Sequence, residues 1–423
     1  WESARMASLS VLTRALSHRN AKVFFTASLI SWTGLWMHRI AISWFAWELT
    51  DSAFWVGMVA FCDLAPAVVV SPIAGAIADR TDRLKLTFWS QAMIGVMAAV
   101  IALLVALDKL DIYTLLALEV LNGIASSFAQ PARQSLMPGL VPRSDLTAAV
   151  GLNSLCFNVA RFVGPALAGP LIAVAGVWPA IAANAVAYFI ATATTPLLKV
   201  SAEERQGHAK TKSLWGEMRD GLRYVAAHPG LGPILTYAAI VALLLRSLPE
   251  ILPPYVERQF GLGAEALAVL TAAFGIGALI SGTVVSARGK MRGTTRLAVF
   301  APAAISLAMV GFIATSWFPF GVLCAAIMGA AMSVHGICAQ TLAQSASDPA
   351  MRGRVLSLWG LIVRAFPALG ALLLGAAGEF FGMTLPTLAA VVLSAIAIAW
   401  GIKRLPAMAQ VLEGDGAGDS AKR

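Results

Sequence analysis

Charged residues are scarce in this sequence. They make up 13% of the 423 residues, against about 25% in ordinary soluble domains, while hydrophobic residues make up 58%. The mean hydropathy is +0.76. This balance excludes a soluble globular domain and indicates an integral membrane protein.

Several chemical signatures are also missing. The chain has only four cysteines, all within apolar stretches, so they predict neither a disulfide framework nor a metal cluster. Paired catalytic acids, a Ser/His arrangement and a nucleotide-binding Gly-x-x-x-x-Gly-Lys-Ser/Thr loop are absent as well. We therefore expect no enzyme, no cofactor, no metal and no self-contained ATP-driven pump.

The sequence does contain long apolar runs. A helix needs about 20 apolar residues to cross the roughly 30 Å of hydrocarbon in a bilayer. Twelve stretches reach that length, at about residues 23–47, 54–78, 86–107, 113–132, 146–174, 177–198, 231–254, 266–286, 297–315, 319–343, 355–377 and 383–402. Barrel strands would instead alternate over ten-residue segments. The expected fold class is all-α, with twelve transmembrane helices in a lipid bilayer.

The distribution of basic residues predicts the orientation. The net charge is +9. If the N-terminus is cytoplasmic, only Lys109 and Arg258 fall on the far side, four arginines lie within spans, and all other basic residues are cytoplasmic. Because this is the positive-inside pattern, we expect both termini in the cytoplasm and no nucleic-acid partner.

The chain divides into two related halves. The longest polar stretch, 199–230, separates an expected bundle at 1–198 from a second at 231–423. Its apolar residues from Leu214 to Val225 fit either a short amphipathic surface helix or a solvated linker. Five residues recur at a nearly constant offset: Arg39 with Arg246, Gly75 with Gly282, Gly123 with Gly329, Gln134 with Gln340, and Arg161 with Arg364. A duplicated six-helix unit explains these matches, so we expect two pseudo-symmetric bundles.

The segment between spans two and three contains a family signature. It reads GAIADRTDRLK and resembles the cytoplasmic loop signature of the major facilitator superfamily, with matches at Gly75, Asp79, Arg80 and Arg83. Glycine permits close helix approach, and Asp79 can accept hydrogen bonds from a helix N-terminus across the domain interface. We predict a cytoplasmic latch here, one-sided because Ser286 replaces the acid in the second half. The alternative is that these charges only set topology.

Span five contains a second signature. It reads ARFVGPALAG and is similar to the family's antiporter signature at Gly164, Pro165 and Gly169. The pattern over nearly the whole chain, including LVPRSDL and MRGRVLSL, resembles the branch with the enterobactin exporter and macrolide-efflux proteins. This resemblance implies a monomeric secondary transporter of the bacterial inner membrane, with Gly164 and Pro165 contributing to the conformational gate.

Span four departs from the family. Many proton-coupled members have Arg-x-x-Gln-Gly there, whereas this chain has Glu119, Asn122 and Gly123. Glu119 is therefore a candidate proton carrier, because burial of a carboxylate favours its protonated form. It could equally neutralise an intramembrane arginine.

Four intramembrane arginines are candidate substrate-binding residues, since a charge there needs a partner, water or a ligand. Arg39 and Asp63 lie at similar depth, which predicts an ion pair, with proton coupling at Asp63 as the alternative. Trp36 lies beside Arg39 on one helical face and predicts either a wall for the cargo or an interhelical seam.

The other three arginines differ in their sequence neighbours. Arg246 and Glu250 are four residues apart and are expected to neutralise each other on one helical face, with Glu250 a further proton-coupling candidate. No acid lies at helical spacing from Arg161 or Arg364, so these two are the foremost substrate candidates. His335 is a further candidate substrate-binding residue, interpreted as an interior histidine that can still titrate in preference to a metal ligand.

Arginines outnumber acids inside the spans, so a cavity there favours an anionic solute. The leading hypothesis is proton-coupled export of a small organic solute, possibly siderophore-like, by alternating access. Uptake of a similar solute is the alternative. A non-transporting sensor or enzyme on the same scaffold is a further one.

Overall fold

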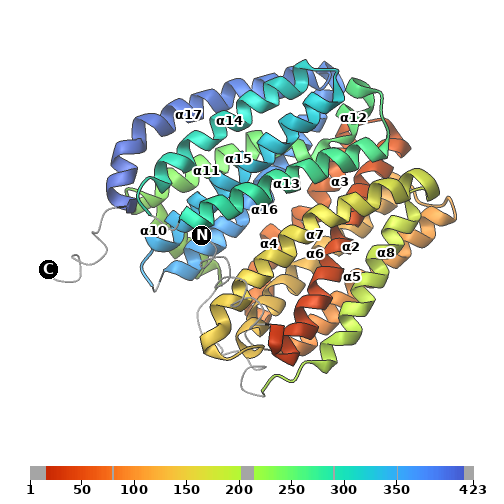
Figure 1. Cartoon of the computed structure of the whole chain (residues 1–423), viewed down its shortest axis with the longest axis horizontal. Helices are drawn as coiled ribbons and strands as arrows, with labels where there is room; N and C mark the ends of the chain where they lie inside the picture. The colour runs from red at the N-terminus through yellow and green to blue at the C-terminus, as the bar shows by residue number, and fades with distance from the viewer. Residues whose placement is uncertain (1–15, 79–80, 202–213, 289–290, 350, 414–423) are drawn as a thin grey trace. The chain divides into compact units, whose positions relative to one another are not determined.

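The computed structural model describes residues 16–78, 81–201, 214–288, 291–349 and 351–413 (Figure 1). Within these ranges the chain is almost entirely α-helical, which confirms the all-α class. The packing divides the chain into two compact units: the first comprises residues 1–49 and 62–211, and the second comprises 50–61 and 212–423.

The described residues up to 201 form seven α-helices. They are α2 (Arg19–Thr50), α3 (Ala53–Leu64), α4 (Pro66–Ala78), α5 (Arg83–Ala106), α6 (Ile112–Leu136), α7 (Leu146–Ala175) and α8 (Trp178–Thr194). Short 3-10 turns follow α6 and α8: η1 (Met137–Gly139), η2 (Arg143–Asp145) and η3 (Thr195–Leu197). Most of α3 packs within the second unit, because Gly57 lets α3 approach the Ala371 carbonyl so closely that a Cβ there would lie 2.5 Å from its oxygen.

The remaining helices belong to the second unit. They are α10 (Leu214–Ala227), α11 (Leu231–Leu245), η4 (Leu248–Ile251), α12 (Pro253–Phe260), α13 (Ala264–Arg288), α14 (Thr294–Ala314), α15 (Phe318–Ser345), α16 (Arg352–Phe381) and α17 (Thr384–Glu413).

Eleven segments of the described chain are long and apolar enough to cross a membrane. α2, which coincides with the first expected span, is not among them, although its 32 residues are long enough to cross. Its polar residues, including His38 and Arg39, lower its hydropathy. α2 thus has too low a hydropathy to count as a candidate span because it carries these polar side chains.

Prolines interrupt two of the expected spans. α3 ends at Leu64 and Pro66 begins α4; likewise α11 ends at Leu245, Pro249 lies in η4 and Pro253 begins α12. Proline has no backbone N–H and favours the first turn of a helix, so each of these prolines restarts the chain as a new helix. The first break places Asp63 in the last turn of α3.

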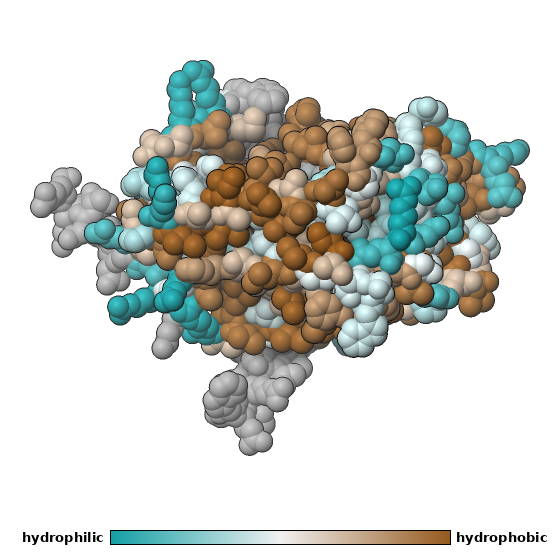
Figure 2. Space-filling view, turned by 90° about the horizontal axis from the view of Figure 1, so that it is seen from above, coloured by the Kyte–Doolittle hydropathy of each residue, from teal (hydrophilic) through white to brown (hydrophobic). Residues whose placement is uncertain are grey.

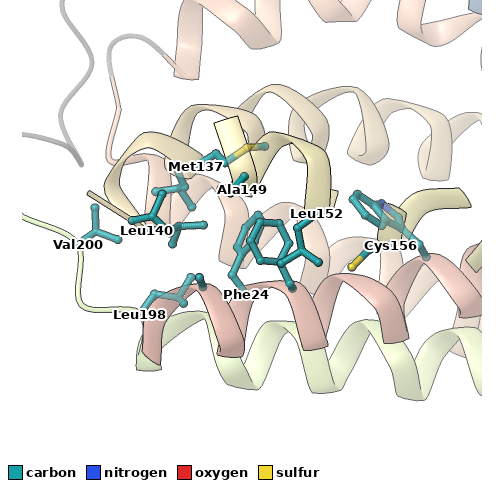
Figure 3. Packing of buried hydrophobic residues seen from close by; sticks show 14 of the residues in the cluster. Phe24, Met137, Leu140, Ala149, Leu152, Cys156, Leu198 and Val200 are labelled. Carbon is teal, nitrogen blue, oxygen red and sulfur yellow. The ribbon is translucent and has the colours of Figure 1, made fainter. Parts of the chain in front are cut away.

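A buried apolar cluster joins α2 to α7 and to the turn after α6. Figure 3 shows Phe24 of α2 close to Leu152 of α7, with Met137 and Leu140 beside them. Residues Leu198 and Val200 after α8 extend the cluster. This packing fixes the position of α2, on which most of the site residues of the first unit lie.

Large apolar side chains also cover the outside of the helices. Val174, Phe380 and Leu307 are 89%, 83% and 75% exposed. On the face seen in Figure 2, apolar residues gather over the middle and hydrophilic residues gather towards both ends. Such a surface suits a hydrocarbon environment with water at each end.

The expected amphipathic segment is a helix, α10, and it belongs to the second unit. It packs against the start of α16, where Asp220 lies 3.8 Å from Arg354 and a Cβ on Gly221 would lie 2.9 Å from the Arg354 Cβ. Val225 is buried, whereas Leu222 is 58% exposed. Residues Leu214–Ala227 are thus helical, and one side of α10 docks on α16.

Candidate functional site

Arg39 and Asp63 form an ion pair within the first unit. Nη2 of Arg39 on α2 donates to Oδ2 of Asp63 on α3 at 2.9 Å, and the two side chains are 26% and 18% exposed. A Cβ on Gly123 of α6 would lie 2.3 Å from the Asp63 carbonyl oxygen, so α6 packs directly against the end of α3. The geometry matches the predicted pairing, while the proton-coupling role of Asp63 stays a prediction.

Trp36 lies near two guanidinium groups. The Cζ atoms of Arg39 and Arg161 lie 5.5 and 5.3 Å from its ring centroid. A Cβ on Gly164 of α7 would lie 2.5 Å from the Trp36 Cβ, which explains why α7 comes close enough to place Arg161 there. The predicted gate residue Gly164 thus also sets the distance between α2 and α7.

Arg133 is a buried arginine that the sequence analysis placed outside the spans. α6 continues to Leu136, so Arg133 lies within the helix and is 5% exposed. Its Nη2 donates to the Ser28 hydroxyl and its Nη1 donates to the Ser31 hydroxyl at 3.4 Å. Its Cζ lies 4.7 Å from the Trp32 ring and 5.5 Å from the Phe24 ring. Gln130 and Gln134 lie near Arg133 in the sequence, and such polar residues are typical of the end of a span. The sequence therefore predicts that Arg133 lies beyond span four.

Phe157 of α7 connects these two arginine sites. Its ring packs edge-on against Trp32 at 5.4 Å and against Trp36 at 6.1 Å. Arginines and aromatic rings therefore form a continuous row, which we call the aromatic–cationic ladder: Phe24, Arg133, Trp32, Phe157, Trp36, Arg39 and Arg161. Cation–π contacts contribute about 0.5–1 kcal/mol at exposed sites and about 2 kcal/mol when desolvated, and of the ladder arginines Arg133 is the buried one.

A cavity of about 260 Å³ opens beside the ladder. Its walls combine ladder residues with amides and a hydroxyl, contributed by α2, α6 and α7: Phe24, Trp32, Gln130, Arg133, Gln134, Asn153, Ser154, Phe157 and Asn158. Aromatic faces, hydrogen-bonding amides and one guanidinium are the groups that a planar or anionic organic molecule requires.

A second polar group is buried between α2 and α6. Nε2 of His38 lies 3.0 Å from Oε1 of Glu119 in a hydrogen bond, and both side chains are at most 3% exposed. Nδ2 of Asn122 donates to the other Glu119 oxygen at 3.4 Å. Glu119 therefore pairs with a histidine, not with an arginine as the alternative interpretation held.

His38 is not among the residues predicted from the sequence, although it lies directly before Arg39. Within the described residues its Nδ1 has no hydrogen-bond partner, nor does Oδ1 of Asn122 or either polar atom of Asn184 on α8. Asn184 lies next to Gly34, one helical turn from His38 on α2. A buried acid and imidazole with spare acceptor and donor atoms nearby form a group that can hold a proton.

The second unit places its sequence candidates differently. Arg246 is the residue directly after α11 and Glu250 lies in η4, so the expected single helical face is wrong because the helix stops before Pro249. Glu250 still interacts electrostatically with Arg246. Arg364 lies half-buried on α16.

His335 is buried in α15. Its Nδ1 donates to the Ala298 carbonyl at 2.8 Å, and its ring packs edge-on against Tyr237 at 5.7 Å. These contacts agree with the interpretation as an interior histidine. A substrate role for His335, Arg246 or Arg364 stays a prediction.

Comparisons with known proteins decide the family. The model of the family described as transmembrane secretion effector matches residues 13–414. The chain belongs to this family of the major facilitator superfamily. It is accordingly a membrane transporter and not an enzyme.

The curated relatives of this chain described here are transporters by name. It is 26% identical to the staphyloferrin A transporter of Staphylococcus aureus, over 86% of this chain and 90% of the relative. It is 24% identical to macrolide efflux protein A of Streptococcus pyogenes, over 79% and 83%, and 25% identical to the enterobactin exporter EntS of Escherichia coli O1:K1, over 86% of each. The predicted branch resemblance is confirmed.

Solved structures confirm the fold of this chain. A bacterial homologue of the human lysosomal transporter Spinster superposes with a TM-score of 0.72 at 16% identity, over 92% of this chain and 98% of that one. At this identity the likeness concerns the fold alone, and it confirms the major facilitator fold.

The signature loop of this family member is only partly described. Gly75 lies in α4, while Asp79 and Arg80 lie outside the described residues, so the predicted latch stays a prediction. Nη1 of Arg83 donates to the Ser135 carbonyl of α6 at 3.4 Å. The family signature has a glycine where this chain has Asp82, and Asp82 caps α5 by accepting from the amides of Leu84 and Lys85 at 2.9 and 3.2 Å. The departure thus exchanges a glycine for a helix cap. Pro165 lies inside α7, which continues through it to Ala175.

Proposed function

We propose that this chain exports a small anionic organic solute from the bacterial cytoplasm in exchange for protons, with both termini cytoplasmic. The observation that carries the proposal is the aromatic–cationic ladder along the cavity of the first unit. Arg133 adds to the excess of arginines over acids that the sequence already indicates. A site with this charge and these rings suits a carboxylate or catecholate better than a cation.

The cargo class follows from the walls of the cavity. Trp32 and Phe157 offer aromatic surface, Arg133 offers positive charge, and Asn153 and Asn158 offer hydrogen bonds. A siderophore combines anionic oxygens with ring or amide surface, so it matches all three kinds of wall. The printed names of two relatives, a staphyloferrin A transporter and an enterobactin exporter, support the same class.

Proton coupling is assigned to Glu119 and His38. Neither side chain is more than 3% exposed, and proton loading on Glu119 would change the charge of a desolvated pair. Such a change is costly enough to favour one conformation over another, which is what an exchange of proton for solute requires. Export is supported by the antiporter signature around Gly164 and Pro165 and by the efflux and exporter names of relatives.

Oriented proteoliposomes test the proposal. Vesicles loaded with radiolabelled catecholate siderophore, citrate-type siderophore or macrolide would be assayed with and without a pH gradient. We expect gradient-driven movement of an anionic siderophore away from the side that carries the termini, with counter-movement of protons. Movement towards that side would establish uptake, and solute flux without proton movement would overturn antiport.

A matched pair of variants ties the flux to the ladder. Phe157→Leu removes the ring between Trp32 and Trp36, whereas Phe260→Leu removes a ring from the aromatic contacts with Phe312 and Phe318 in the second unit. We expect Phe157→Leu to lower flux at least tenfold and Phe260→Leu to leave it within about twofold, which is 0.4 kcal/mol or less. Equal losses would show that the ladder is only packing.

A further inference from the structure

A second hollow lies in the second unit. It is a groove of about 1070 Å³ between α13 and α14, which both pack against α15 (Figure 1). Val334 of α15 lines it, and Val284, Leu297 and Phe300 are among its apolar lining residues. Val284 is 65% exposed and Phe300 is 41% exposed, so the walls are open and not closed over by the fold.

Three arginines gather at one end of this groove. They are Arg288 at the end of α13, Arg292 in the turn, and Arg296 in the first turn of α14, and all three are exposed. Nη2 of Arg288 donates to the Arg292 carbonyl at 2.7 Å. The Cζ of Arg296 lies 5.8 Å from the Phe300 ring. These contacts hold two of the guanidinium groups at the groove.

Among the described residues, Glu413 is the acid whose contacts bring it near these arginines. Glu413 at the end of α17 accepts from the backbone amides of Gly293 and Thr295 at 2.6 and 2.5 Å. Its carboxylate therefore already satisfies the N-terminus of α14. The arginines still outnumber it, so the end of the groove stays positive.

The membrane position of the groove divides its charge from its apolar surface. The candidate spans end at Val285 on α13 and begin at Thr294 on α14. Arg288 and Arg292 lie just beyond these limits and Arg296 lies just inside, whereas Val284 and Phe300 lie within the spans. Positive charge thus falls at the level of headgroups and apolar surface falls at the level of acyl chains.

We infer that this α13–α14 groove binds an anionic phospholipid. The phosphate would lie among the three arginines, and an acyl chain would follow the exposed apolar walls. A soluble phosphate compound satisfies the arginines but leaves the apolar walls uncovered, and a zwitterionic lipid lacks the net charge that they favour. In the orientation proposed above, the lipid belongs to the cytoplasmic leaflet, where basic pockets between helices recognise such headgroups. The binding itself does not depend on that orientation or on the cargo.

The test compares lipids and variants of the full chain in nanodiscs. Native mass spectrometry would count retained phosphatidylglycerol, and thermal unfolding would be measured in phosphatidylcholine with and without phosphatidylglycerol. The wild type should retain phosphatidylglycerol and gain several degrees in Tm, because a ligand that binds only the folded state raises its stability. Arg288→Gln/Arg292→Gln/Arg296→Gln should retain at least one lipid fewer and lose the gain in Tm.

A control with the same kind of charge change separates this site from general attraction. Arg219→Gln/Arg223→Gln alters two exposed arginines of α10 and should keep both lipid retention and the gain in Tm. If soluble glycerol phosphate stabilises the wild type as well as phosphatidylglycerol does, the site is a phosphate site and the lipid inference is wrong. Equal loss in the control, or full retention by the triple variant, would also overturn it. If the triple variant unfolds in phosphatidylcholine, the single variant Arg296→Gln replaces it in the same assay. Arg296→Gln should retain less phosphatidylglycerol than the wild type, and full retention by Arg296→Gln would overturn the site.

Discussion

The two units share repeated arginines but bury different kinds of polar contact. In the first unit, short contacts join ionisable side chains: the half-buried Arg39 with Asp63, and the buried Glu119 with His38. In the second unit, Arg246 interacts electrostatically with Glu250, and buried hydroxyls pair with one another, Tyr255 with Thr387 at 2.5 Å and Ser306 with Ser394 at 2.8 Å.

This difference separates two uses of a polar group in a membrane. A hydrogen bond between neutral hydroxyls stabilises the association of two helices by about 1 kcal/mol. Burying these groups costs little because neither carries a charge. Buried charges are expensive to desolvate and are retained mainly where chemistry needs them. In the function proposed above, the first unit binds the solute and carries the proton, while the second unit keeps comparable arginines without those roles.

The largest effect is expected at Glu119. Glu119→Gln keeps the shape of the side chain but cannot carry a proton, so a pH gradient should no longer drive solute accumulation in proteoliposomes. Solute exchange without a gradient should persist, because the ladder is unchanged. The matched variant Glu250→Gln in the second unit should keep its coupling. If the pH gradient still drives accumulation in Glu119→Gln, or no longer does so in Glu250→Gln, proton coupling is not confined to the first unit.

The next effect concerns stability. Asp63→Asn leaves the half-buried Arg39 facing a neutral amide and should reduce the free energy of unfolding by about 2 kcal/mol, less than a fully buried pair because both side chains keep some exposure. Tyr255→Phe removes a neutral hydroxyl contact and should reduce it by about 1 kcal/mol. Chemical unfolding in detergent micelles measures both values. A larger loss for Tyr255→Phe would mean that the second unit depends more on its polar contacts.

The sequence predicts these contacts unevenly. The ends of most helices, the Arg39–Asp63 pair and the family follow from hydropathy, depth and short signatures. The ladder does not, because a cation–π contact between α6 and α2 depends on which faces of two helices meet, and Arg133 looks like a residue beyond a span. His38 also escaped notice, since only its packing against Glu119 distinguishes it from other polar residues of α2. The breaks in two spans could have been found, because Pro66 and Pro249 are visible in the sequence.

Arg161 and Arg364 sharpen the comparison further. Both are sequence candidates for the cargo site, but Arg161 lies at the end of the ladder, where a contact with the Trp36 ring positions it. Arg161→Gln should weaken apparent solute affinity about tenfold, which is 1.4 kcal/mol, and Arg364→Gln should weaken it less. Concentration dependence of flux gives both affinities, with Arg219→Gln on α10 as the control. Equal tenfold losses would mean that both units contribute to the cargo site.

The smallest effect separates the helix caps of the two units by pH. In the first unit, the Asp111 carboxylate caps α6 by accepting from the amides of Tyr113 and Thr114 at 2.9 and 3.1 Å. Hydrogen bonds, above all that from the Thr114 hydroxyl, lower the pKa of Asp111 from its ordinary 3.8. In the second unit, Nδ1 of His228 accepts from the amides of Gly230 and Leu231 before α11 at 3.2 and 3.1 Å. Burial lowers the pKa of His228 from its ordinary 6.5.

For each group the pKa is lower in the folded state than in the unfolded state. The resulting stabilisation is complete when the pH is above the unfolded-state pKa, and it is lost as the pH falls through the folded-state pKa. The His228 cap should therefore weaken below about pH 6.5, while the Asp111 cap should persist until about pH 4. Hydrogen exchange at pH 7 and pH 5, corrected for intrinsic rates, should show lost protection at the start of α11 and unchanged protection at the start of α6. His228→Asn keeps a side-chain acceptor that does not titrate and should remove the difference between the two pH values. Equal loss at both helices would instead indicate general acid unfolding, because a cap-specific effect must follow the group that titrates.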